Sequence, residues 1–133
     1  MQKIIVGLVL AFITLSSGAR ADNDCSRFAS DLSRFQSEED DMLRELNRVT
    51  AMTPAPTKDV ALCRVLRAYA NDAPYFLLAE TAYPSCFINA DKAKAFTNYV
   101  HDNYLNVGTL VGGYCSEDEL SRPAESKVLG SGK

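Results

Sequence analysis

Three long stretches of the chain repeat apolar residues at alternating spacings of three and four, which is the pattern of an amphipathic α-helix. The first predicted helix runs from Asp24, a suitable N-cap, to Thr50. Pro54 and Pro56 follow it, and proline ends a helix because it lacks a backbone N–H. The apolar face of this helix consists of Cys25, Phe28, Leu32, Phe35, Met42, Leu46 and Val49, with Glu39 as a polar interruption.

The second predicted helix starts near Thr57, which we expect to cap it, and Pro84 ends it. Pro74 inside this stretch leaves two alternatives, one kinked helix or two helices separated at this point. The third predicted helix covers about residues 89–110 and ends at a glycine-rich segment. The two apolar faces consist of Leu62, Leu66, Tyr69, Ala73, Phe76 and Tyr83, and of Phe96, Tyr99, Val100, Val107 and Leu110.

The sequence divides the chain into three predicted parts. Residues 1–21 have the features of a secretory signal peptide: the positive charge of Lys3, an apolar run too short to span a membrane, and a small-residue cleavage site ending at Ala21. Residues 22–115 predict an all-α domain, a three-helix up-down-up bundle. Residues 116–133 have few apolar side chains, so we expect a disordered tail that does not pack.

Four cysteines remain after the predicted cleavage, an even number that indicates two disulfides in an exported protein. No C-x-x-C pair is present, which disfavours a redox or zinc site. In an up-down-up bundle, Cys25 and Cys86 lie at one end and Cys63 and Cys115 at the other. Mostly helical chain between Cys63 and Cys86 separates them by roughly 30 Å, whereas bonded cysteines have Cα atoms within about 7 Å. We therefore predict the pairs Cys25–Cys86 and Cys63–Cys115.

The chain has 133 residues, 14 basic and 17 acidic, and loss of the signal peptide shifts the net charge from −3 to −5. This charge disfavours nucleic-acid binding and favours a protein partner with a neutral or basic surface. The lone histidine, His101, follows no metal-binding pattern and is expected at the surface beside Asp102, so we predict no metal and no cofactor. An exported chain without N-glycosylation sequences is expected to be periplasmic or secreted, with no stable membrane anchor.

Glu39 interrupts the apolar face of the first helix at a level where Tyr69 and Asn103 of the other helices can reach it. These three residues form a candidate buried polar layer, and burial would raise the pKa of the carboxyl group toward that of an acid catalyst. The alternative places Glu39 in water with the rest of the acidic run 38–41. We favour the solvated arrangement, because small errors in helix rotation move a residue from core to edge.

All six tyrosines lie between residues 69 and 114, more than a thin bundle can bury. Tyr75, Tyr83, Tyr99 and Tyr104 are therefore a candidate interface, since tyrosine is enriched where proteins meet. The favoured function is a small exported protein-interaction module without enzymatic activity. The alternatives are a periplasmic chaperone that acid activates by exposing apolar surface, and a small enzyme with Glu39 as its acid or base.

Overall fold

The computed structural model describes residues 19–128, and all of its regular elements are helices. The signal peptide expected over residues 1–21 lies outside this part except for its last three residues, which begin the first helix, and residues 129–133 also lie outside it. The helices are α1 (Ala19–Thr50), α2 (Val60–Leu77), α3 (Ala79–Ala82), the 3₁₀ turn η2 (Pro84–Cys86), α4 (Ala90–Tyr114) and α5 (Glu117–Leu120). The all-α prediction is confirmed.

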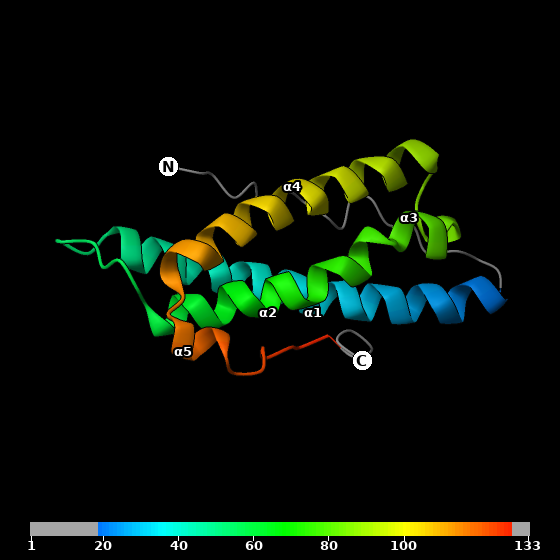
Figure 1. The fold of residues 1–133 in the computed structure, drawn as a ribbon. Helices are drawn as coiled ribbons and strands as arrows, with labels where there is room; N and C mark the ends of the chain where they lie inside the picture. Colours follow the sequence, from blue (N-terminus) through cyan, green and yellow to red (C-terminus); the bar gives the residue numbers. More distant parts are fainter. Residues whose placement is uncertain (1–18, 129–133) are drawn as a thin grey trace.

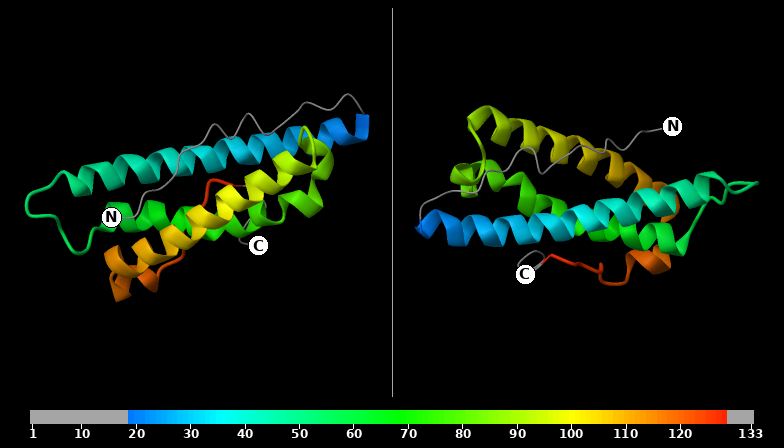
Figure 2. Two further views of the ribbon diagram at one scale, coloured as in Figure 1. Left: turned by 90° about the horizontal axis from the view of Figure 1, so that it is seen from above. Right: turned by 180° about the vertical axis from the view of Figure 1, so that it is seen from behind.

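The three long helices pack along one another, with α2 in contact with both α1 and α4. The chain reverses direction between α1 and α2, and again between α2 and α4 (Figure 1). Two further views show that α1 is the longest helix and that the C-terminal segment lies on the side of the molecule away from α4 (Figure 2). This arrangement turns the apolar faces of the three helices toward a shared interior.

The helix starts correct two local expectations, and the course of α2 decides between the two alternatives left open at Pro74. α1 begins at Ala19, so Asp24 lies inside the helix and is not its N-cap. Asp59, not Thr57, caps α2 by accepting a hydrogen bond from the Leu62 amide at 2.9 Å, because its carboxylate satisfies a donor of the first turn. Pro74 lies inside α2, which continues to Leu77, so the helix does not break there.

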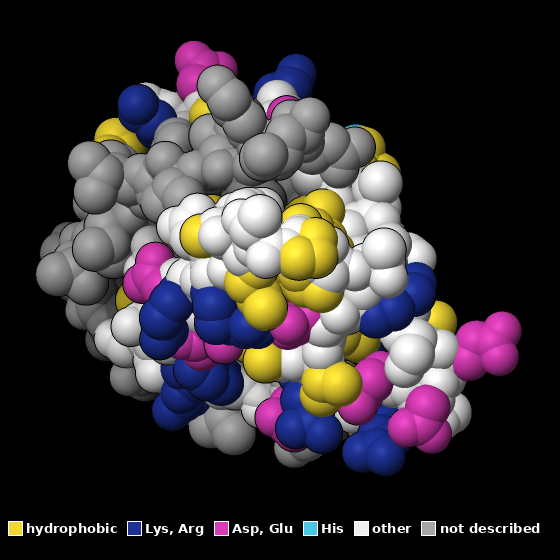
Figure 3. Space-filling view, turned by 90° about the vertical axis from the view of Figure 1, so that its left-hand side faces the viewer, with side chains coloured by type: hydrophobic (Ala, Val, Ile, Leu, Met, Phe, Trp, Pro, Cys, Tyr) yellow, Lys and Arg dark blue, Asp and Glu magenta, His cyan; other side chains and the backbone are white. Residues whose placement is uncertain are grey.

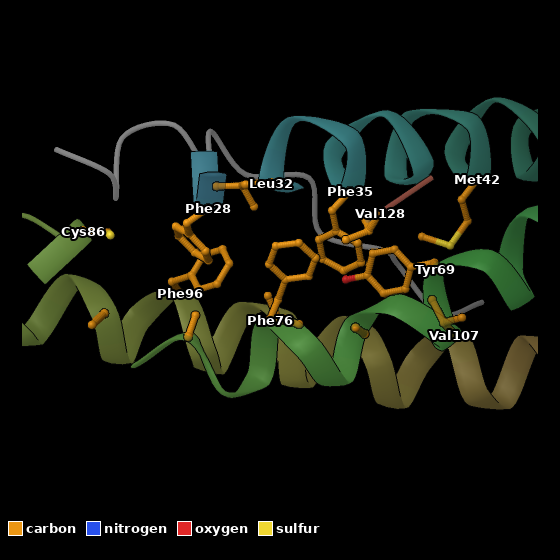
Figure 4. Close-up of a cluster of buried hydrophobic side chains, with 14 of the residues drawn as sticks. Phe28, Leu32, Phe35, Met42, Tyr69, Phe76, Cys86, Phe96, Val107 and Val128 are labelled. Carbon is orange, nitrogen blue, oxygen red and sulfur yellow. The ribbon is translucent and has the colours of Figure 1, made fainter. Parts of the chain in front are cut away.

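The core is a row of aromatic side chains between the helices (Figure 4). Phe35 of α1 stacks on Phe76 with ring centroids 4.2 Å apart and on Tyr69 at 4.5 Å, both from α2. Phe28 and Phe96 continue the row toward Cys86. Most of the predicted face residues are buried, and Leu46 and Leu110 at the edge are half-buried.

Two disulfides join the helix ends, and both predicted pairs are confirmed. Cys25 bonds Cys86 with Cα atoms 5.3 Å apart, and Cys63 bonds Cys115 with Cα atoms 5.0 Å apart. No cysteine is left free. The first bridge joins α1 to η2, and the second joins α2 to the end of α4, so the long helices are cross-linked near both ends.

The segment expected to be a tail packs against the helices as far as it is described. Arg67 of α2 donates hydrogen bonds to the carbonyl oxygens of Glu119 and Arg122, both at 2.6 Å. Glu119 and Val128 are buried, and Val128 joins the aromatic core. The expectation that residues 116–133 do not pack is therefore wrong for residues 116–128. Counting apolar residues missed it because one valine, two polar side chains and backbone carbonyl groups carry the attachment.

Candidate functional site

Four carboxyl groups lie in the interior of the bundle. Asp31, Glu38 and Glu39 of α1 and Asp72 of α2 have exposed fractions of 3%, 2%, 4% and 0%. The favoured expectation that Glu39 is solvated with its neighbours is wrong. Of the run 38–41, Glu38 and Glu39 are buried, while Asp40 is exposed. Buried carboxyl groups need hydrogen-bond partners or a proton, so the surroundings of each define what it can do.

Glu39 belongs to a polar layer between α1 and α4. Its two carboxyl oxygens accept the Tyr99 hydroxyl at 2.8 and 2.9 Å, and the Asn103 side-chain amide lies 3.4 Å from one of them. Burial raises the pKa of Glu39 to about 7, although the bond from Tyr99 opposes this shift. Tyr69 lies in the same interior, and burial raises the pKa of its hydroxyl as well. The direct hydroxyl donor to Glu39 is thus Tyr99, which the sequence had suggested for an interface.

Three of the four candidate interface tyrosines have hydroxyl groups engaged inside the protein. Tyr75 donates to Asp31 at 3.1 Å, and its oxygen lies 3.2 Å from that of Tyr83. Tyr83 also stacks on Phe28, with ring centroids 5.0 Å apart. Tyr104 is half-buried. Tyr75 and Tyr99 therefore donate to buried carboxyl groups, a role that leaves less of their surface for a partner.

Glu38 and Asp72 form a buried carboxyl pair that sequence reasoning missed. Burial, together with the hydrogen bond and the negative charge of Asp72, raises the pKa of Glu38 to about 9. Glu38 therefore keeps its proton at neutral pH. One signal was available, because Glu38 lies three residues after Phe35 and four before Met42, a spacing that places it on the apolar face.

A cavity of about 230 Å³ opens beside this pair, between α1, α2 and the C-terminal segment. We define the α1–α2 groove by the helix residues that border it: Glu38, Asp41, Arg64, Val65 and Ala68. Residues 125–127 form its other wall. Asp41 pairs with the Lys127 ammonium group at 2.5 Å, and this contact, with Arg44, lowers the pKa of Asp41.

The rest of the surface offers weaker candidates. His101 is exposed, as the sequence predicted, and its Nδ1 atom lies 3.7 Å from the Asp102 carboxylate. Apolar side chains lie among charged ones at the end where α1 stops and α2 starts (Figure 3), and Met52 and Val60 there are about half exposed, which is ordinary for a protein surface. Within residues 19–128, no group of three or more acidic, histidine or cysteine side chains is arranged to hold a metal ion.

Comparison with protein-family models, curated proteins and solved structures finds no match to this chain. None of the helices within the described residues combines the length and apolar character of a membrane span. The α1–α2 groove brings together a cavity, buried carboxyl groups and a segment distant in sequence.

Proposed function

We propose that the mature chain is an exported, non-enzymatic protein-interaction module that acts in the periplasm or outside the cell. Two disulfides support an oxidising compartment, because such bonds persist there and are rare in the cytosol. The three long helices, in the up-down-up order expected from the sequence, supply a cross-linked scaffold whose surface grooves keep their shape. The partner binds at the α1–α2 groove.

The observation that carries this proposal is the way the groove already holds an extended segment. Residues 126–128 lie against α1 and α2 without helix or strand pairing, and they make contacts through their side chains and through the Lys127 backbone amide. A groove that holds an irregular segment of chain in this way has the chemistry needed to hold a segment of another protein.

The charge of the groove sets the kind of partner. Asp41 and Asp72 lie on or under its floor, and Glu38 there keeps its proton. Arg64 adds one positive charge at the border, and the net charge of the mature chain is negative. Complementarity then favours a neutral or basic partner segment. The partner is a protein, because the chain has the wrong net charge for nucleic acid.

The two alternative functions have less support. An acid-activated chaperone would need the bundle to loosen at low pH, whereas the raised pKa values of Glu38 and Glu39 mean that mild acid favours the folded state. An enzyme built on Glu39 would need a substrate cavity at that carboxyl group. The cavity described above is bordered by Glu38, and Glu39 faces Tyr99 on the α4 side.

Site-specific photo-crosslinking in the exporting cell tests the proposal. A photoreactive amino acid at Val65 reports on the groove, and one at Lys94, exposed on α4, is the matched control. We expect a discrete protein adduct from position 65 that is lost when Asp41→Lys reverses the groove charge. Equal adducts from both positions, or no adduct from position 65, would contradict the proposed function.

A further inference from the structure

The structure assigns the α1–α2 groove a ligand chemistry: we propose that it binds a partner segment presenting a hydroxyl, a lysine and a β-branched side chain in succession, and that residues 126–128 occupy this site in the free protein. The inference rests on the proposed function and specifies its partner. Ser126, Lys127 and Val128 each contact a different feature of the helices.

Each of the three side chains has its own recognition group. The Ser126 hydroxyl donates to the buried Asp72 carboxylate at 2.7 Å. The Lys127 ammonium group reaches Asp41 at 2.5 Å and the Ser37 hydroxyl at 3.3 Å. Val128 is only 4% exposed and packs in the aromatic core. The protein thus offers a separate contact for a hydroxyl, for a cation and for a branched apolar side chain at three consecutive positions.

The floor of the groove disfavours acidic segments. Glu38 and Asp72 already share an interior position, and the Lys127 backbone amide lies 3.5 Å from the Glu38 carboxyl group. An acidic side chain at the position of Ser126 or Lys127 would add a negative charge against Asp72 or Asp41, and like charges at short range repel. Selection therefore works through repulsion as well as attraction.

The contacts of residues 126–128 differ in how strongly each can hold the segment. Half of the Lys127 side chain is exposed, so water screens its ion pair with Asp41. Val128 is the one buried apolar residue between positions 121 and 128. The tether adds to these contacts, because a short linker gives the segment an effective concentration of the order of millimolar. A partner segment that makes better contacts can displace it.

The groove has room for better contacts. The cavity of about 230 Å³ stays open beside the segment, and Val65 and Ala68 give it an apolar side. A partner segment with a large apolar side chain at the position of Glu125 would cover Val65 and Ala68. Residues 125–127 of this chain leave that apolar surface uncovered. In the free protein, residues 126–128 therefore occupy the groove and bind it less tightly than the proposed partner segment would.

Peptide binding to the full chain tests this inference. The variant Ser126→Ala, Lys127→Glu, Val128→Asp keeps the chain length and frees the groove, and the probe is a fluorescent peptide with the sequence of residues 121–128. By anisotropy we expect the freed variant to bind at least ten-fold more tightly than the parent chain. A peptide carrying Lys127→Glu should lose this binding, and one carrying Glu125→Leu should gain affinity.

Retention of the fold is checked by far-UV circular dichroism, and the single variant Lys127→Glu replaces the triple variant if that one unfolds. Equal binding of the peptide to parent and freed chains would overturn the inference, as would no binding to a folded freed chain. Exchange of segments between two copies, seen as a dimer by sedimentation in place of peptide binding, would overturn it too. Crosslinks at Val65 without peptide binding would remove this inference and leave the proposed function standing.

Discussion

Glu38 of α1 and Asp72 of α2 place two carboxyl groups close together in the interior, where burial and the neighbouring carboxyl group keep Glu38 protonated at neutral pH. The Ser126 hydroxyl and the Lys127 amide close this pair from the side of the C-terminal segment. Ionisation of Glu38 would bury two adjacent negative charges. The protonation state of the pair is therefore linked to the stability of the fold and to the seating of the segment over it.

The first prediction concerns the dependence of stability on pH. The pKa of Glu38 rises from 4.5 to about 9 on folding, so the folded state holds an extra proton between these values and its stability is lost as pH rises through them. The pKa of Glu39, about 7 when folded, acts with the same sign between pH 4.5 and 7. The free energy of unfolding should fall with rising pH, by up to about 1.4 kcal/mol per unit for each group, so more steeply below pH 7 than above it. Urea denaturation from pH 5 to 9 measures it.

The variant Glu38→Gln isolates the contribution of this pair, because an amide cannot ionise yet can still donate to Asp72. Its stability should vary less than that of the parent between pH 7 and 9 and should exceed that of the parent at pH 9. Asp102→Asn, on the exposed face of α4, is the matched control and should keep the parent slope. A parent protein that becomes more stable from pH 5 to 9 would show that the pair is not protonated.

The second prediction concerns Tyr99, whose hydroxyl favours the ionised form of Glu39. Tyr99→Phe should raise the pKa of Glu39 above about 7 and cost about 1 kcal/mol of stability near neutral pH. Carbon-detected NMR titration of the Glu39 carboxyl group measures the shift. Tyr104→Phe on the same helix is the control and should leave this titration in place; an unchanged Glu39 titration in Tyr99→Phe would argue against the polar layer.

The third prediction concerns the C-terminal segment. Ending the chain after Cys115 should lower the melting temperature, because it removes Val128 from the core and both carbonyl partners of Arg67. Val128→Ala alone should cost about 1–2 kcal/mol. Leu120→Ala, at a half-exposed position, should cost about 0.5 kcal/mol or less. Equal melting temperatures for the truncated and full chains would instead support the expectation from the sequence that this segment does not pack.

The fourth prediction concerns Pro74, which is exposed inside α2. Pro74→Ala supplies an N–H that can donate to the Ala70 carbonyl, so thermal melting should occur at the same temperature or higher. A clear loss of stability would mean that the fixed backbone angle of Pro74 begins a separate helix.

The fifth prediction concerns the disulfides, whose cysteines are 61 and 52 residues apart in the chain. On the chain-entropy model each bond contributes about 4 kcal/mol, and the overlapping loops make the two values non-additive. The double variants Cys25→Ser/Cys86→Ser and Cys63→Ser/Cys115→Ser should each melt at a much lower temperature. Mass spectrometry of non-reduced peptides checks the pairing, and a fragment joining Cys63 to Cys86 would contradict the fold.

The sequence by itself determined the helices, most of their apolar faces and both disulfide pairs. Helix periodicity is local, and a rigid helix between Cys63 and Cys86 keeps those two thiols too far apart to bond. The same periodicity marked Glu39 as an interruption of the core face.

Tertiary structure alone decided which acids are buried and what they touch. Neighbouring positions on a helix point about 100° apart, so a small rotation of α1 chooses among Glu38, Glu39 and Asp40, and the packing of α2 and α4 sets that rotation. The seating of Val128 and Ser126 likewise depends on partners far away in the chain. Local sequence patterns predict where a helix forms and which face is apolar. The contacts in the groove depend on segments far apart in the chain, so they form only when the chain has folded.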